Sequence, residues 1–143
     1  MRAIIMAAGL ALAATPALAA DPVEGDWLIQ SGRAKITIAP CVGRPDQMCG
    51  AISWLKQPLG QDGQPRRDTA NPNPQLRQQP LLGSTMLSGF HRAEPGRWTG
   101  GRIYDANDGK SYNSKMRVAP DGTLKVEGCI LVICQAQTWR RSP

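Results

Sequence analysis

Apolar and polar residues alternate along most of the chain after residue 20. Residues 34–38, 115–118 and 123–127 each place an apolar side chain at every second position, with Lys, Arg, Thr or Glu between them. A period of two is typical of a β-strand that buries one face and leaves the other in water. The pattern therefore predicts an all-β domain of half-buried strands.

Turn-forming dipeptides divide this pattern into short segments. Asp108-Gly109 and Asp121-Gly122 tolerate the positive φ angles of tight hairpins, and they bracket one predicted strand. Eight antiparallel strands can close into an up-and-down barrel, which removes the exposed edges of an open sheet. We therefore predict a single eight-stranded barrel, with a two-sheet sandwich as the alternative. The expected strands lie near residues 24–31, 33–40, 48–56, 84–93, 96–105, 110–119, 122–130 and 134–141.

One long interruption separates the third and fourth predicted strands. Residues Gln57 to Pro80 are rich in Pro, Asn and Gly, a composition that opposes both helix and strand. A short helix near Leu76 to Leu82 is the alternative for the second half of this segment. Loops of this length in compact domains are often functional. We expect the loop to cross one mouth of the barrel.

The first 20 residues have the pattern of a cleaved secretory signal peptide. Arg2 precedes the apolar run 3–14, and the small-residue site Pro16-Ala17-Leu18-Ala19-Ala20 follows. An uncleaved membrane anchor is disfavoured because the run is shorter than the ~17 to 25 residues that span a bilayer. We expect a signal peptide at 1–20 and one β-barrel domain at 21–143, located in the periplasm or secreted.

The charge of the chain is mildly basic and scattered. The formal net charge of +6 falls to +5 when Arg2 leaves with the signal peptide. Arg66-Arg67 and Arg140-Arg141 are the basic pairs, and neither is interleaved with aromatic residues as in nucleic-acid-binding modules. We therefore expect no nucleic-acid partner and no transmembrane segment. Anionic groups of the cell envelope are the alternative to a simply solvated surface.

Four cysteines in an exported domain of this size predict disulfides. Four cysteines allow three pairings. Cys41 and Cys49 flank one predicted turn, and Cys129 and Cys134 flank another, so each pair is placed to staple its own hairpin. The alternative, a zinc site, is disfavoured because neither spacing is Cys-x2-Cys and the chain has one histidine. We predict two hairpin disulfides, no metal and no cofactor.

No arrangement of residues in the sequence is typical of a known catalytic motif. His91 is the only histidine, and neither Gly-x-Ser-x-Gly nor His-Glu-x-x-His is present. Gly109-Lys110-Ser111 resembles the end of a phosphate-binding loop, but Tyr104 occupies the position of the required glycine. Residues 105–109 imitate the start of a calcium loop that lacks its glutamate at position twelve. We assign no catalytic residue.

Two apolar features of the sequence are candidates for a binding function. Residues Ile130 to Ile133 place four aliphatic side chains at a hairpin tip, where polar residues are usual. We expect this tip to fold over the barrel end; contact with a partner, a membrane or an apolar ligand is the alternative. Aromatic side chains of a barrel either fill the core or line a ligand cavity. The aromatic residues are Trp27, Trp54, Phe90, Trp98, Tyr104, Tyr112 and Trp139.

The whole domain resembles a bacterial exported family known as domain of unknown function 2147. The resemblance implies a lipocalin-like or streptavidin-like barrel and no established activity. In calycin barrels, which the first and last strands also resemble, an Arg lies over the first-strand Trp; here Arg140 or Arg141 would lie over Trp27. The matching blocks are Gly25-x-Trp27, Cys49-Gly50-x-Ile52-x-Trp54-Leu55, Asp68-x-x-Asn71-Pro72, Pro80-Leu81-Leu82-Gly83, Gly101-x-Ile103-Tyr104-Asp105, Asp108-Gly109-Lys110-x-Tyr112 and Gln137-Thr138-Trp139-x-Arg141.

These features favour a non-enzymatic periplasmic binding protein that holds a small hydrophobic or amphipathic ligand in the barrel. Asp68 and Asn71 are expected on the rim of the mouth. The expected aromatic residues of the site are Trp54, Trp98, Tyr104 and Tyr112.

Two other functions are the alternatives. One is a hydrolase or modifying enzyme that acts on an envelope polymer with Asp68, Asn71 and Tyr104 or Tyr112. The other is a structural or assembly role, in which Ile130 to Ile133 meet an envelope protein.

Overall fold

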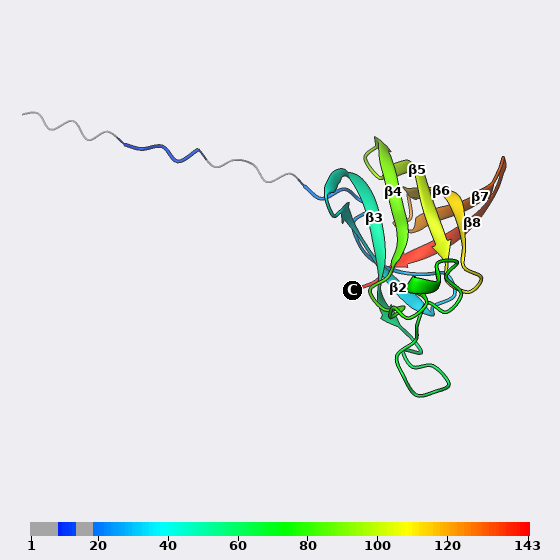
Figure 1. The fold of residues 1–143 in the computed structure, drawn as a ribbon. Helices are drawn as coiled ribbons and strands as arrows, with labels where there is room; N and C mark the ends of the chain where they lie inside the picture. Colours follow the sequence, from blue (N-terminus) through cyan, green and yellow to red (C-terminus); the bar gives the residue numbers. More distant parts are fainter. Residues whose placement is uncertain (1–8, 14–18) are drawn as a thin grey trace, which may run out of the picture.

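The computed structural model describes residues 9–13 and 19–143, and within them the chain forms a closed antiparallel barrel. Each strand pairs with the next in the sequence, and β8 returns to β1 (Figure 1). The predicted eight-stranded barrel is confirmed, and the sandwich is wrong. The strands are β1 (Gly25–Leu28), β2 (Ala34–Cys41), β3 (Arg44–Leu55), β4 (Thr85–Glu94), β5 (Arg97–Asp105), β6 (Lys110–Val118), β7 (Leu124–Ile130) and β8 (Ile133–Arg141).

The predicted signal peptide lies largely outside the described residues, since 1–8 and 14–18 are not described. Among the described residues, no helix has the length and hydropathy needed to cross a bilayer.

The hydrophobic core lies between the strands, inside the barrel. Trp27, Leu87 and Phe90 are fully buried there. Gly101 on β5 has no side chain because a Cβ at that position would lie 2.4 Å from the Phe90 ring. Large side chains therefore fill the barrel interior. The buried cluster comprises Val23, Trp27, Ile36, Ile38, Met48, Ile52, Leu87, Phe90, Trp98, Met116, Leu124, Val126 and Trp139.

The segment before β1 covers one end of the barrel. Asp21 accepts hydrogen bonds from the Trp98 indole (3.0 Å) and the Gly96 amide (3.2 Å), and Val23 accepts one from the Trp27 indole (2.8 Å). The Asp21 carboxylate also pairs with Arg92 at 3.5 Å. These contacts close the end and provide partners for both buried indoles.

The seam between β1 and β8 is short. It consists of two residue pairs, Trp27 with Arg141 and Leu28 with Arg140. β7, in contrast, pairs with β8 along its whole length, from the pair Leu124–Trp139 to the pair Ile130–Ile133. The first half of β8 therefore has β7 as its only neighbouring strand among the described residues. The β7–β8 hairpin projects from the body of the barrel (Figure 1).

The β2–β3 hairpin begins earlier than the sequence predicts. We expected β3 from residue 48, but it starts at Arg44 because Val42-Gly43 forms the turn, with Gly43 at a φ of +77°. The Cys41–Cys49 disulfide lies across this hairpin. Pro45 is tolerated there because it is exposed near the end of the strand pair.

The long connection between β3 and β4 lies across the opposite end of the barrel, which we call the loop end (Figure 1). The prediction of a loop in this region is confirmed. Its helical part is one turn of 3₁₀ helix, Pro74–Leu76, in place of the helix considered near 76–82. The side chain of Asn73 caps that turn by accepting a hydrogen bond from the Gln75 amide at 3.1 Å.

Candidate functional site

The loop end contains a buried carboxylate, Asp68, whose oxygens accept hydrogen bonds from three side chains. Asp68 is 1% exposed. Its Oδ1 accepts a hydrogen bond from the Tyr104 hydroxyl at 2.6 Å. Its Oδ2 accepts from the Asn71 amide at 2.8 Å and from the Gln79 amide at 3.5 Å. The loop is thereby fixed to β5 through a charged group with full hydrogen-bonding partners.

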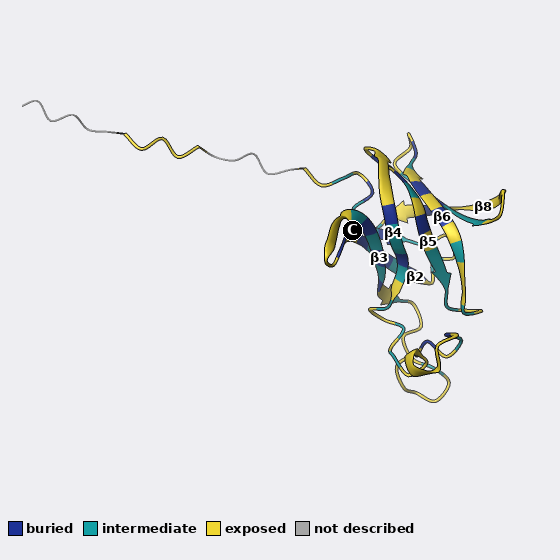
Figure 2. Cartoon of the chain, turned by 45° about the horizontal axis from the view of Figure 1, so that its top comes forward, coloured by how far each residue is buried: buried dark blue, intermediate teal, exposed yellow. Residues whose placement is uncertain are grey.

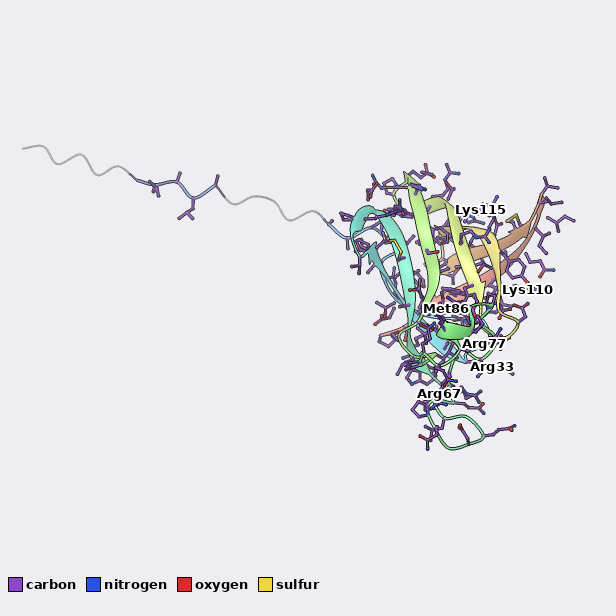
Figure 3. The ribbon with its side chains drawn as sticks, in the orientation of Figure 1. Arg33, Arg67, Arg77, Met86, Lys110 and Lys115 are labelled. Carbon is purple, nitrogen blue, oxygen red and sulfur yellow. A yellow bond between two sulfur atoms is a disulfide. The ribbon has the colours of Figure 1, made fainter. Side chains whose placement is uncertain are left out.

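A close backbone approach holds the same loop against the β5–β6 turn. Gly109 has a φ of +71°, and a Cβ on it would lie 1.9 Å from the Ala70 carbonyl oxygen. The Arg77 guanidinium donates to the Asn71 carbonyl at 2.8 Å, which ties the 3₁₀ turn to the cluster. Figure 3 shows Arg33, Arg67 and Arg77 around this end of the barrel.

The tyrosines at this end are proton donors rather than bases. Burial and the Asp68 carboxylate raise the pKa of Tyr104 well above its ordinary value. The pKa of Tyr112 is also raised, by desolvation and by Asp108, whose carboxylate accepts a hydrogen bond from the Tyr112 hydroxyl at 3.2 Å. Both phenols therefore stay protonated at neutral pH and brace the loop and the turn.

Trp54 and Trp98 do not join this cluster. Trp54 is 40% exposed, with the Lys35 ammonium 5.4 Å from its ring centroid. A bulge at Ser53 shifts the register between Ile36–Ile52 and Lys35–Trp54, so Trp54 leaves the inner face that Ile52 occupies. Trp98 is buried at the opposite end, on Asp21. Trp54 and Trp98, which we expected in one site with Tyr104 and Tyr112, therefore lie apart from the Asp68 cluster.

A groove of about 440 Å³ lies elsewhere, between β5, β6 and the β7–β8 hairpin. We call it the hairpin groove. Glycine backbone and Ser114 form part of its lining, while Leu131 and Val132 come from the hairpin tip. Its lining residues are Thr99, Gly100, Gly101, Asn113, Ser114, Lys115, Cys129, Leu131, Val132 and Cys134.

Polar groups in the hairpin groove are positioned by neighbours. The Ser114 hydroxyl donates to the Glu127 carbonyl at 2.6 Å, and the Lys115 ammonium pairs with the Glu127 carboxylate at 3.3 Å. Asn113 accepts a hydrogen bond from Arg102 at 2.8 Å. The groove thus combines an apolar wall with fixed polar groups, the composition of small-molecule sites.

The hairpin tip does not fold over the barrel end as expected. Leu131 and Val132 are 89% and 94% exposed, and they lie beside residues of β5 and β6 that line the groove. β1 pairs only with Arg140 and Arg141 at the end of β8. The start of β8 is therefore not held against the mouth by β1, and the tip extends into solvent.

A second, smaller groove of about 340 Å³ lies at the β1–β2 turn. It is lined by Leu28, Ile29, Gln30, Ser31, Gly32, Thr138 and Arg140.

Both predicted disulfides are confirmed, Cys41 with Cys49 and Cys129 with Cys134. The carboxylate of Glu127 lies within 4.8 Å of the sulfurs of Cys129 and Cys134. Bonded to each other, these sulfurs are not the thiolates that a zinc site requires. Disulfides of this kind are typical of proteins that fold in an oxidising compartment.

Arg141, at the end of β8, places its guanidinium over the indole of Trp27 in β1. Its Cζ is 3.9 Å from the Trp27 ring centroid. Its two terminal nitrogens donate to the carbonyls of Glu24 (2.6 Å) and Pro22 (2.8 Å). Arg140, one position earlier, faces the opposite side and lines the smaller groove.

Sequence reasoning missed most residues of the hairpin groove. Ser114 and Lys115 belong to no distinctive motif, and Gly101 stood in a block of the family resemblance that did not indicate a groove. The other signal was the apolar run Ile130 to Ile133, which marked the tip as unusual without indicating what it lies against.

The closed, sequentially connected eight-stranded barrel has a lipocalin-like fold. Protein HP1028 from Helicobacter pylori, described as belonging to the lipocalin family, is similar with a TM-score of 0.71 and 20% identity, over 85% of this chain and 83% of that one. The chain belongs to the bacterial family described as "Uncharacterized protein conserved in bacteria (DUF2147)", whose model matches residues 25–141. No curated protein matches the chain.

Proposed function

We propose that the chain is an exported, non-enzymatic protein of the periplasm or extracellular space that binds a small, partly apolar molecule in the hairpin groove. The observation that carries the proposal is the groove itself. Its volume of about 440 Å³ falls within the range of small-molecule sites, about 300–1,000 Å³. The lipocalin-like fold is compatible with this function.

The filled core is the reason for placing the ligand in the groove rather than deep in the barrel. Thirteen buried residues pack together inside the barrel. An eight-stranded barrel has room either for its own side chains or for one small ligand. We therefore place the site at the wall of the barrel, where Gly100 and Gly101 of β5 contribute no side chains to the groove.

The hydrolase alternative has less support. Its proposed acid, Asp68, is 1% exposed and both of its oxygens are occupied by donors of the protein. A general acid or base has to reach the substrate proton directly or through one water. The arrangement around Asp68 instead supports a bracing role.

Recovery of a bound molecule tests the proposal. The mature protein, purified from a bacterial periplasm under native conditions, is extracted with organic solvent, and the extract is analysed by mass spectrometry. We expect one class of amphipathic molecule to co-purify in near-stoichiometric amount. The variant Thr99→Trp fills the groove and should lose the molecule, whereas Thr85→Trp, an equally large change on β4 outside the groove, should keep it.

Equal recovery from parent, Thr99→Trp and Thr85→Trp would overturn the site. No retained molecule, together with no binding when an envelope extract is added back, would overturn the function.

A further inference from the structure

The tip of the β7–β8 hairpin is the most concentrated exposed apolar surface of the described residues. Ile130, Leu131, Val132 and Ile133 are 65%, 89%, 94% and 73% exposed. They are consecutive, so no polar side chain interrupts them. Figure 2 shows this hairpin as exposed where it leaves the barrel. We propose that the tip docks the protein on an anionic lipid bilayer by inserting these four side chains into the membrane interface.

A disulfide and strand pairing fix the conformation of the tip before it binds. The Cys129–Cys134 disulfide closes its base, and Ile130 pairs with Ile133 across the turn. Leu131 adopts a φ of +54°, the only positive φ at a described non-glycine residue. A stapled turn loses little conformational entropy on insertion, so more of the free energy of burying the aliphatic groups is available for binding.

The size of the tip favours a bilayer over a folded protein. A standard protein interface uses about 20–30 residues on each side. Here the apolar surface is four side chains on a narrow projecting hairpin, with charged and polar residues around its base. Such a shape penetrates a fluid interface readily but offers a flat partner little area.

The charge near the hairpin complements anionic lipid. The formal net charge of +6 falls to +5 without Arg2. Lys110, labelled in Figure 3, projects from β6, the strand next to the hairpin, whereas Lys115 on the same strand is paired with Glu127. Each basic residue near an anionic surface adds about 1 kcal/mol of attraction at low ionic strength.

Vesicle sedimentation tests the proposal. The mature, oxidised protein is mixed with vesicles of phosphatidylcholine and phosphatidylglycerol, and with vesicles of phosphatidylcholine alone. We expect binding to the anionic vesicles that weakens with added salt. The double variant Leu131→Asp/Val132→Asp should bind at least about tenfold more weakly. Val42→Asp removes another fully exposed aliphatic residue, at the β2–β3 turn, and should bind like the parent.

A fluorescence measurement distinguishes insertion from surface attraction. In Val132→Trp, the added indole should be quenched by brominated lipid and shift to shorter wavelength on the vesicles. Absence of parent binding at low salt, or equal binding by parent and Leu131→Asp/Val132→Asp, would overturn the proposal. A concentration-dependent dimer abolished by that double variant, without vesicle binding, would assign the tip to a second copy instead.

Discussion

At the scale of single residues, Gly109 is the position where a small change should have the largest effect on the loop end. Gly109→Ala adds a Cβ against the Ala70 carbonyl and places a side chain at a φ of +71°. We expect the free energy of unfolding to fall by about 2–4 kcal/mol, from backbone strain and overpacking together. Equilibrium urea denaturation measures this.

Gly122→Ala is the matched control for Gly109→Ala. Gly122 also has a positive φ, of +84°, but a Cβ there meets nothing within 4 Å. Gly122→Ala should lower the free energy of unfolding only by the backbone strain, about 1–2 kcal/mol. Equal losses in the two variants would show that the contact with Ala70 contributes nothing.

Tyr104 should give the protein a dependence of stability on alkaline pH. Because its pKa is raised in the folded state, the folded protein keeps this proton above about pH 10, where the unfolded chain has lost it. The stabilisation is fully present below that pH and declines as the pH rises. Unfolding temperatures of parent and Tyr104→Phe, compared from about pH 8 to about pH 11, should show a steeper decline in the parent. Parallel curves would contradict the assignment.

At the scale of the elements, the β7–β8 hairpin depends on its disulfide. Replacing Cys129 and Cys134 by Ala removes the closure of a short loop, and we expect the free energy of unfolding to fall by about 2 kcal/mol. The tip should also open locally, because the first half of β8 pairs with β7 alone. Hydrogen exchange at residues 133–137 should accelerate more than exchange in β2 and β3. Uniform acceleration across the barrel would contradict a local role.

Strand alternation was enough to predict the barrel, and the places where prediction failed have local causes. The β3 bulge at Ser53 moved Trp54 to the outer face, and alternation alone does not reveal a bulge. The disulfide pairs followed from their positions at turns. The hairpin groove, in contrast, depends on how far the β7–β8 hairpin projects, which is set by the short β1–β8 seam rather than by any motif. The pairing of Asp68 with Tyr104 joins residues 36 positions apart through an irregular loop, so no periodic pattern indicates it.

At the scale of the whole molecule, Arg141 joins the last strand to the segment that begins the domain. Arg141→Ala removes a cation–π contact with Trp27 and two hydrogen bonds to carbonyls, and we expect the free energy of unfolding to fall by about 2–3 kcal/mol. Arg141→Lys should restore less than half of that loss, because an ammonium lacks the planar fork. Arg140→Ala, one residue away, should change stability by less than about 0.5 kcal/mol. Comparable losses at both positions would contradict the closing role of Arg141.

The central claim is that the hairpin groove, and not the barrel interior or the loop end, is the binding site. Amide NMR shifts of the ¹⁵N-labelled mature protein, titrated with a solvent extract of bacterial envelope, test it most directly. We expect saturable shifts at Gly100, Gly101, Asn113, Ser114 and Val132, and we expect Thr99→Trp to abolish them. Saturable shifts confined to the region around Asp68 and Tyr112, or to the core around Phe90, would contradict it.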